Sequence, residues 1–282
     1  MIIDAHQHFW DPVRADYPWM AAPELTPIRR AFAPVDLAPL LRDNGIDATV
    51  LVQCRSSLDE TEEFLRIAAD TPFIAGVVGW IDLTDGAAGE TVDRLRRSPG
   101  GKKLVGIRHQ VHDEADPDWL LREGVQRGLT AIFARDLTYD LLVRTRELPA
   151  AIATAQAFPR ARFVLDHAAK PPIADGSRDE WAGRLAALAA CGNVWCKISG
   201  LATEAIWDDW DATRLFPYVA HAAACFGEDR LIFGSDWPVC LLAGSYGEIK
   251  RALDECVMKL GPQFRDKAFG PNTQRAYRLA LA

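Results

Sequence analysis

Short apolar segments recur along the chain at intervals of roughly 25–45 residues, about the length of one strand plus one helix. Segments such as Ala48–Cys54 and Phe73–Leu83 are apolar throughout, with little alternation of polar residues. Continuous apolar runs of this length are typical of parallel strands buried on both faces of a sheet. Eight strands are predicted: Ile2–His8, Ala48–Cys54, Phe73–Leu83, Leu104–Val111, Leu137–Val143, Arg162–Ala168, Asn193–Gly200 and Arg230–Asp236.

The segments between the predicted strands carry helix signals. Residues 57–70 begin with Ser57, which can cap a helix, and continue with an acidic first turn. Proline and glycine terminate helices, and such residues mark the ends of three further helical segments. These segments are residues 148–159 with Pro159, residues 179–191 with Gly192 and residues 215–227 with Gly227.

Eight strands that alternate with helices predict an α/β protein whose parallel sheet closes into a (β/α)8 TIM-like barrel. The length of 282 residues fits one such barrel, so residues 1–282 are expected to form a single domain. An open doubly wound sheet would usually place a glycine-rich loop after the first strand, whereas this strand runs into HQHFWDP. The proline-rich residues from Tyr17 to Pro39 are expected to form a long first loop over the barrel mouth.

Composition narrows the class of partner. The net charge of -7 gives no basic footprint, so no nucleic-acid partner is expected. The six cysteines include no CxxC pair, which favours reduced thiols. The first residues lack the features of a signal peptide, and no apolar run approaches the roughly 18 residues that span a bilayer. A cytoplasmic protein without a membrane partner is therefore expected.

Two histidines, His6 and His8, lie near the end of the first predicted strand. Because side chains alternate along a strand, both are expected to point to one side, together with Asp4. Two imidazoles so placed can hold a metal ion or a substrate oxygen. The alternative is a pair of satisfied core or surface histidines, but the carboxyl end of a barrel strand is where barrel active sites lie.

His167 and Asp236 end the sixth and eighth predicted strands. Because the eighth strand of a closed barrel lies next to the first, Asp236 is expected to face His6 and His8. A carboxylate beside imidazoles is suited to taking a proton from water. The alternatives are a histidine that caps a loop and an aspartate that serves only as a turn residue.

Three further residues are candidates. Arg108 and His109 end the fourth strand, where adjacent side chains face opposite ways, so only one should enter the site unless a bulge turns both in. Arg108 could bind a carboxylate or polarise a carbonyl, or could pair with Asp113 or Glu114. Lys197 lies within the seventh strand and is predicted to point inward, as a cation for substrate or as a partner of a carboxylate.

The segments IDAHQHFWDP, GIRHQVHDE, FVLDHAAKPP, CKISGL and LIFGSDWPV together resemble the amidohydrolase superfamily. They are similar to its amidohydrolase-2 branch and, within it, to the L-fuconolactonase- and L-rhamnonolactonase-like sugar lactonases. The likeness extends in order over nearly the whole chain. It implies a distorted (β/α)8 barrel and a carboxylic-ester hydrolase of L-fucose catabolism, which opens a small sugar lactone to the aldonic acid.

By the family pattern, the metal ligands map to His6, His8, His167 and Asp236. Full metal-dependent members carry further ligands, such as a second later-strand histidine or a bridging lysine or glutamate, and these have no clear counterpart here. The resemblance therefore leaves open one zinc or another divalent ion, or catalysis without a metal, because a lactone is an activated ester.

The hypothesis for the reaction makes Asp236 the general base that activates water. The developing oxyanion would be stabilised by His167, by Arg108 or His109, or by a zinc ion. Trp10, Trp237 and Lys197 are expected to bind the sugar, although the two tryptophans could equally be core residues. The rival hypotheses are a metal-dependent decarboxylase on the same barrel and a non-catalytic barrel that binds a sugar acid.

Overall fold

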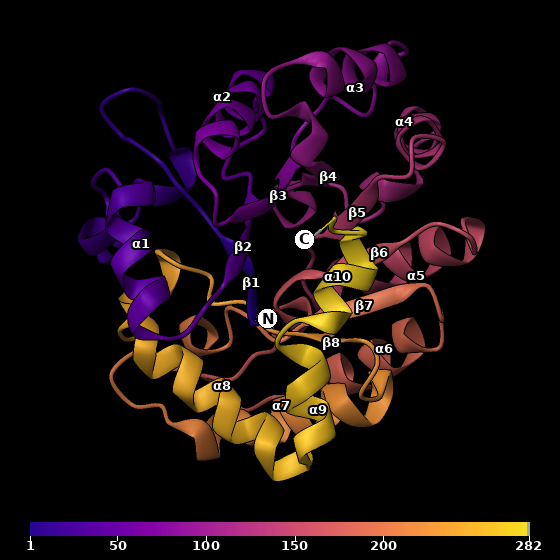
Figure 1. Ribbon diagram of the computed structural model, residues 1–282. Coiled ribbons are helices and arrows are strands. Elements are labelled where there is room, and N and C mark those ends of the chain that lie inside the picture. The colour runs from indigo at the N-terminus through magenta and orange to yellow at the C-terminus, as the bar shows by residue number, and fades with distance from the viewer. Residues whose placement is uncertain (281–282) are drawn as a thin grey trace.

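The computed structural model describes residues 1–280 and contains an eight-stranded parallel sheet in the order β1 to β8 (Figure 1). The barrel closes where the backbone N–H of Ala5 donates to the carbonyl of Phe233 at 3.1 Å. All eight predicted strands are present, each shorter than predicted. They are β1 Ile3–Gln7, β2 Ala48–Val52, β3 Ile74–Gly79, β4 Leu104–His109, β5 Thr138–Leu141, β6 Phe163–Leu165, β7 Val194–Lys197 and β8 Leu231–Ile232.

Helices surround the barrel and connect its strands (Figure 1). They are α1 Pro34–Asp43, α2 Leu58–Asp70, α3 Ala88–Arg97, α4 Glu123–Phe133, α5 Leu148–Ala157, α6 Asp179–Ala189, α7 Ala212–Phe226, α8 Tyr246–Leu260, α9 Pro262–Ala268 and α10 Pro271–Tyr277. The cap predicted at Ser57 is confirmed, because its side chain accepts a hydrogen bond from the N–H of Glu60. Gly227 also ends α7 as predicted, with a φ of 68°.

Two predictions about helix boundaries were wrong. Helix α6 is capped by Ala190, so Gly192 lies beyond its end and not at the cap. The predicted loop from Tyr17 to Pro39 stops at Ala33, since Pro34 begins α1. Proline fits the first position of a helix because the N–H that it lacks would have no intrahelical partner there.

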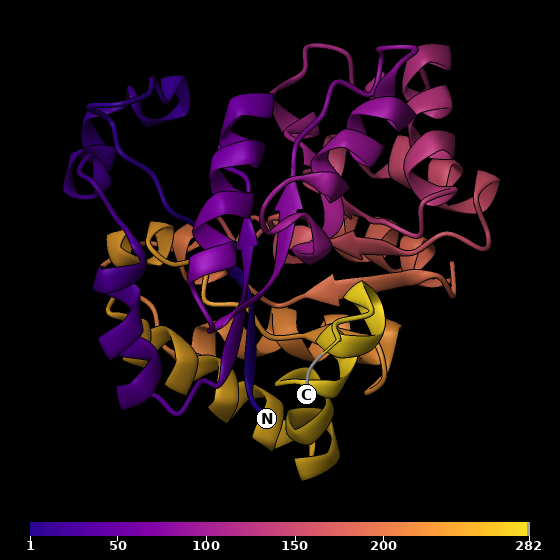
Figure 2. The same ribbon diagram turned by 45° about the horizontal axis from the view of Figure 1, so that its top comes forward.

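The core has an inner and an outer layer. Small aliphatic side chains such as Val50, Val78 and Val164 fill the barrel interior, while a larger cluster lies between the sheet and the helices. The amino end of the barrel is covered by α9 and α10, and Tyr277 of α10 reaches the inner cluster. Figure 2 shows α10 and the N-terminus at one end of the barrel, and the β1–α1 connection projecting toward the other.

A bulge in β1 changes the side to which its residues point. The register against β2 shifts between Asp4 and Gln7. Ala5 therefore faces the barrel interior, and Asp4 faces the helices, where its carboxylate accepts from the hydroxyl of Tyr246 at 2.9 Å. The prediction that Asp4 shares a side with His6 was wrong, because strict alternation does not hold across a bulge.

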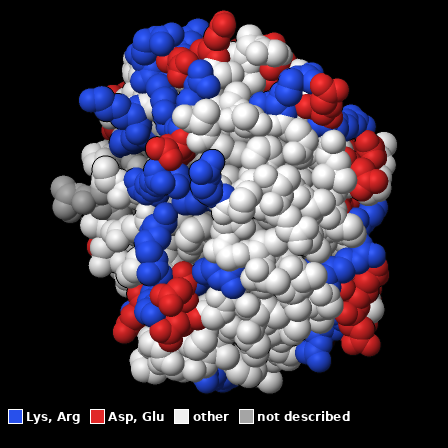
Figure 3. Space-filling view, turned by 90° about the vertical axis from the view of Figure 1, so that its right-hand side faces the viewer, with Lys and Arg blue, Asp and Glu red and all other residues white. Residues whose placement is uncertain are grey.

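The surface in Figure 3 carries Lys and Arg side chains in groups that adjoin Asp and Glu side chains. Among residues 1–280, no helix combines the length and the apolar character that crossing a bilayer requires.

Candidate active site

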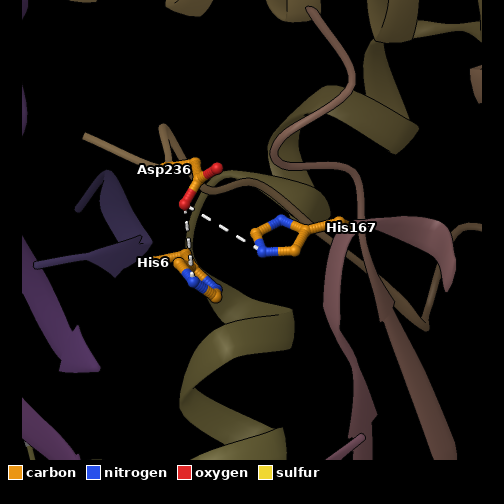
Figure 4. A group of neighbouring side chains, drawn as sticks. All are labelled: His6, His167 and Asp236. Atoms are coloured by element: carbon orange, nitrogen blue, oxygen red, sulfur yellow. Dashed lines mark ion pairs between the residues drawn. The ribbon is translucent and has the colours of Figure 1, made fainter. Parts of the chain in front are cut away.

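Four side chains meet at the carboxyl ends of β1, β6 and β8. Nε2 of His6 lies 3.2 Å from Nε2 of His8, and Oδ1 of Asp236 lies 3.3 Å from Nε2 of His8 and 3.7 Å from Nε2 of His6. Nε2 of His167 lies 4.0 Å from the same Oδ1. Figure 4 shows His6, His167 and Asp236 pointing toward one another. The predicted convergence of the first and last strands is therefore present.

The backbone at two of these residues is left-handed. Asp236 has a φ of 59°, and His167 begins a run of four residues with positive φ that ends at Lys170. Each such residue costs about 1–2 kcal/mol relative to the right-handed conformation. Strained backbone of this kind is concentrated at functional sites, where it aims side chains. Here it turns Asp166 and His167, which are adjacent in sequence, into the same site.

A buried layer of ion pairs lies directly below the histidines. Lys197 donates from Nζ to Oδ2 of Asp140 at 2.7 Å and lies 2.9 Å from Oδ1 of Asp166. Arg108 donates from one guanidinium nitrogen to Oδ2 of Asp166 at 2.9 Å and from the other to the carbonyl of Gln53. The alternative pairing of Arg108 with Asp113 or Glu114 does not occur.

This layer is tied to the other end of the barrel. The hydroxyl of Tyr277, in the C-terminal helix α10, donates to Oδ2 of Asp140 at 2.6 Å. Asp140, Asp166 and Lys197 are fully buried. Buried charges are tolerated only when they are paired and hydrogen-bonded, so the ring of partners fixes each of them in place.

Burial and charge set the protonation of the site. Burial lowers the pKa of both His6 and His167 well below the ordinary value for histidine, so both rings are neutral near pH 7. Burial opposes ionisation of Asp236, but the groups around it, His167 foremost, outweigh burial and lower its pKa. Burial likewise opposes ionisation of Asp166, whose pKa is nevertheless held well below its ordinary value, chiefly by Lys197. The site thus combines neutral imidazoles with ionised carboxylates.

One predicted residue, His109, faces away from this cluster. His109 points to the opposite side of β4 from Arg108: its ring stacks on Trp119 at 4.0 Å, Nδ1 accepts from the indole of Trp80, and Nε2 lies 2.8 Å from Glu114. The expectation that only one of the two neighbours enters the site is therefore met by Arg108.

Both predicted tryptophans are almost entirely buried in one aromatic cluster. Trp10 donates its indole N–H to the carbonyl of Ile28, and both Trp10 and Trp237 pack edge-on against Phe32. Lys197 does point inward, as predicted, but it meets carboxylates and not solvent. These three side chains leave little surface for a sugar, because the core has already covered them.

Four residues of the site were not predicted. Asp140 is the one charged residue of the predicted strand Leu137–Val143, which is the same signal that singled out Lys197, and Asp166 immediately precedes His167. Ser199 follows β7, and its hydroxyl pairs with Nδ1 of His167 at 2.9 Å. Tyr277 carries no signal in the sequence, because only the fold brings α10 beneath the barrel.

The donor atoms at the mouth fit a zinc-type metal ion. One ligand atom each from His6, His167 and Asp236 lies within 4.8 Å of the others, and all three residues are buried. Nδ1 of His8 donates to the carbonyl of Val52 at 2.7 Å, so its Nε2 keeps a lone pair that faces Asp236. Imidazole nitrogen and carboxylate oxygen are ligands that Zn²⁺ uses in catalytic sites.

A closed (β/α)8 barrel with clustered histidines and a carboxylate at the carboxyl ends of its strands is the architecture of a barrel hydrolase. Residues 3–279 match the amidohydrolase family. The chain is 43% identical to the L-fucono-1,5-lactonase of Burkholderia ambifaria, with 98% of this chain and 95% of that protein covered. It is 39% identical to the L-fucono-1,5-lactonase of Burkholderia multivorans, with 98% and 96% covered.

A solved structure gives the same assignment. The crystal structure of an amidohydrolase from Burkholderia multivorans with bound zinc has a TM-score of 0.93 and 38% sequence identity, and 99% of each chain is covered. This protein therefore belongs to the amidohydrolase family.

Proposed function

We propose that the protein hydrolyses a sugar lactone of the L-fucono-1,5-lactone type to the aldonic acid. The observation that carries the proposal is the meeting of Asp236 with three histidines at the barrel mouth. Two relatives at 43% and 39% identity over nearly the full chain are L-fucono-1,5-lactonases. Because the family match covers residues 3–279, residues 1–282 are proposed to act as one barrel domain.

Asp236 is the proposed general base. Its lowered pKa keeps the carboxylate ionised near neutral pH, and it retains a small exposure to solvent, as His8 and His167 do. Asp236 accepts a proton from a water molecule, whose oxygen attacks the lactone carbonyl carbon. The same carboxyl group then returns the proton to the ring oxygen as the carbon–oxygen bond breaks. The proton count balances, and the product is an open-chain acid.

His167 and Arg108 are the proposed sources of oxyanion stabilisation. His167 is held against Asp236 by its strained backbone and by Ser199, so its position is fixed before the substrate binds. Arg108 lies below, 3.2 Å from Nε2 of His6, and supplies positive charge to the floor of the site. His109 has no contact with this group, and its proposed role is to position Trp80 and Glu114.

His6, His8, His167 and Asp236 are proposed to hold one zinc or another divalent ion. Such an ion would polarise a carbonyl oxygen and lower the pKa of bound water. The support is the donor set described above and the zinc in the related crystal structure.

The rival decarboxylase is less well supported. Two decarboxylase structures share the fold at 16% and 13% identity, a likeness that extends to architecture alone. A non-catalytic barrel would have no use for charged groups buried around a neutral histidine pair, because burying them costs stability.

A lactone panel tests the proposal. Acid release is followed with a pH indicator on L-fucono-, L-rhamnono- and D-arabinono-lactones, with and without a chelator. We expect hydrolysis of at least one of them, fastest for L-fucono-1,5-lactone. Release of acid from none of the lactones, in the presence or absence of Zn²⁺, would overturn the proposal, and a parallel assay for carbon dioxide would detect the decarboxylase.

A further inference from the structure

His6 lies between two cations, and its ring cannot accept a hydrogen bond from both. Nζ of Lys197 lies 3.2 Å from Nδ1, and a guanidinium nitrogen of Arg108 lies 3.2 Å from Nε2. Lysine and arginine only donate, whereas a neutral imidazole accepts at one nitrogen and carries its proton on the other. One of the two contacts is therefore not a hydrogen bond.

His8 decides which contact forms. Because its Nδ1 carries a proton for the carbonyl of Val52, its Nε2 accepts, and that atom lies 3.2 Å from Nε2 of His6. His6 satisfies this acceptor when its proton is on Nε2. Nδ1 of His6 then accepts from Lys197, whose second hydrogen bond goes to Asp140. Arg108 meanwhile donates to Asp166 and Gln53.

A second acceptor is already present for the opposite tautomer. Oδ1 of Asp166 lies 3.3 Å from Nδ1 of His6, is fully buried, and makes no hydrogen bond. This oxygen forms an ion pair with Lys197, but the contact does not have the alignment of a hydrogen bond. A buried, unpartnered carboxylate oxygen is costly and requires an explanation. It could accept a hydrogen bond if the proton of His6 were on Nδ1.

We propose that Lys197 and Asp166 form a tautomer switch for His6. Lys197 is the hydrogen-bond donor to the ring in the metal-free site, and Asp166 is the acceptor from it in the metal-bound site. In the metal-free protein His6 carries its proton on Nε2 and accepts from Lys197. Metal binding needs the lone pair of Nε2, so the proton lies on Nδ1 and is donated to Asp166. The net charge of the ring is the same in both forms. Nδ1 of His6 therefore has a hydrogen-bond partner in both states of the site.

The switch assigns positioning roles to residues that do not face the substrate. Asp140 and Tyr277 hold Lys197 from below, and Arg108 holds Asp166. Groups that accept the second ring proton of a metal-binding histidine orient it and typically change metal affinity by roughly 10–100-fold. The inference depends on the proposed metal site but not on the identity of the lactone.

The test is ¹⁵N NMR of histidine-labelled full-length protein, with the His6 signals assigned by a His6→Gln variant. Spectra are recorded after chelation and after addition of Zn²⁺ alone. We expect the protonated nitrogen of His6 to be Nε2 after chelation and Nδ1 with Zn²⁺. The signals of His221, which pairs with the carbonyl of Ala182 in α6, should not change.

Two variants separate the parts of the switch. Lys197→Met combined with Asp140→Asn removes an opposite pair of charges together, so that no new buried charge is left unpaired. We expect its chelated form to show the Nδ1 proton already. Asp166→Asn should keep the Nε2 proton and weaken Zn²⁺ binding by roughly 10–100-fold in calorimetry.

The inference is overturned if His6 has the same tautomer before and after addition of Zn²⁺. It is also overturned if a folded, chelated Lys197→Met/Asp140→Asn protein keeps the Nε2 proton of the chelated wild type. If that variant does not fold, Asp166→Asn decides alone: undiminished Zn²⁺ affinity refutes the role of Asp166. Lactone hydrolysis by the same wild-type sample tests the proposed function separately. A protein that switches without turnover refutes only the lactonase, and one that turns over without switching refutes only the switch.

Discussion

Gly200 lies so close beneath His167 that a Cβ atom at this position would be 2.5 Å from Nδ1 of the imidazole. The same atom would be 3.2 Å from Oδ2 of Asp236. Gly200 also has a φ of +64°, in the left-handed region that favours glycine. Two independent constraints, one from the backbone and one from close packing, thus reserve this position for glycine. The packing constraint concerns the side chains that are proposed to act on the substrate.

Replacing Gly200 with alanine should therefore reduce activity more than stability. We expect kcat to fall by at least roughly tenfold, because a displacement of about 1 Å in a catalytic group can cost a hundredfold. Steady-state kinetics and thermal unfolding check this. Gly192→Ala is the matched control, since its added Cβ meets nothing within 4 Å. Equal kinetics in the two variants would contradict the proposed role of His167.

Asp236→Asn should abolish most turnover while the barrel remains folded. The amide keeps the shape of the side chain but cannot accept a proton, and removing a general base typically costs roughly 10²–10⁴-fold in rate. The comparison is kcat on the best lactone of the panel, with circular dichroism as the check of folding. Activity within a factor of three of wild type would show that another group activates the water.

Strand β4 offers a test of side-chain direction. Arg108→Lys keeps the charge but loses the planar fork that contacts both Asp166 and Gln53, so we expect a loss of roughly 10–100-fold in kcat/KM. His109→Phe keeps the stack on Trp119 and should cost much less. Initial rates for both variants decide the matter. The reverse order would restore His109 as a catalytic candidate.

Zinc should stabilise the protein if the proposed ligands bind it. A ligand present at a hundred times its Kd stabilises the folded state by about 2.7 kcal/mol, which for a chain of this size raises Tm by roughly 5 °C. His167→Gln should lose most of this shift in differential scanning calorimetry. His221→Gln, which changes a histidine on α7, should retain it. A full shift in the His167 variant would place the ion elsewhere.

Glu60 should make stability depend on pH. Its carboxylate accepts from the backbone N–H groups of Cys54 and Arg55, but burial dominates and raises its pKa to about 7. Between its ordinary pKa and 7, the folded state binds more protons than the unfolded state, so stability falls as pH rises through this window. At 1.36 kcal/mol for each unit, the loss is about 3 kcal/mol, and it is complete above pH 7.

Urea unfolding at pH 5 and pH 8 measures this effect. The difference between wild type and Glu60→Gln isolates Glu60, because other titrating groups are common to both proteins. Wild type should lose stability relative to the variant between the two pH values. The control is Glu123→Gln, which changes an exposed side chain and should show no such difference from wild type. Parallel behaviour of wild type and Glu60→Gln would mean that Glu60 is not titrating in this range.

The sequence by itself determined the barrel, its eight strands and the ends at which chemistry occurs. These follow from local rules: apolar runs predict buried parallel strands, and residues such as Ser57 and Gly227 satisfy helix ends through their own chemistry. Barrel closure then places His6 near Asp236, although 230 positions separate them in the chain. The motifs around His6, His167 and Asp236 are also local in the sequence, and for that reason they carried the resemblance to the family.

Only the tertiary structure decided which way individual side chains point and what they contact. The bulge in β1 directs Asp4 toward the helices, and left-handed backbone turns Asp166 and His167 into one site. Neither of these two orientations follows from strand periodicity. The contact of Tyr277 with Asp140 spans 137 positions. Buried charges are compatible with folding only when every partner is in place, and those partners come from strands and a helix that meet only when the barrel has closed.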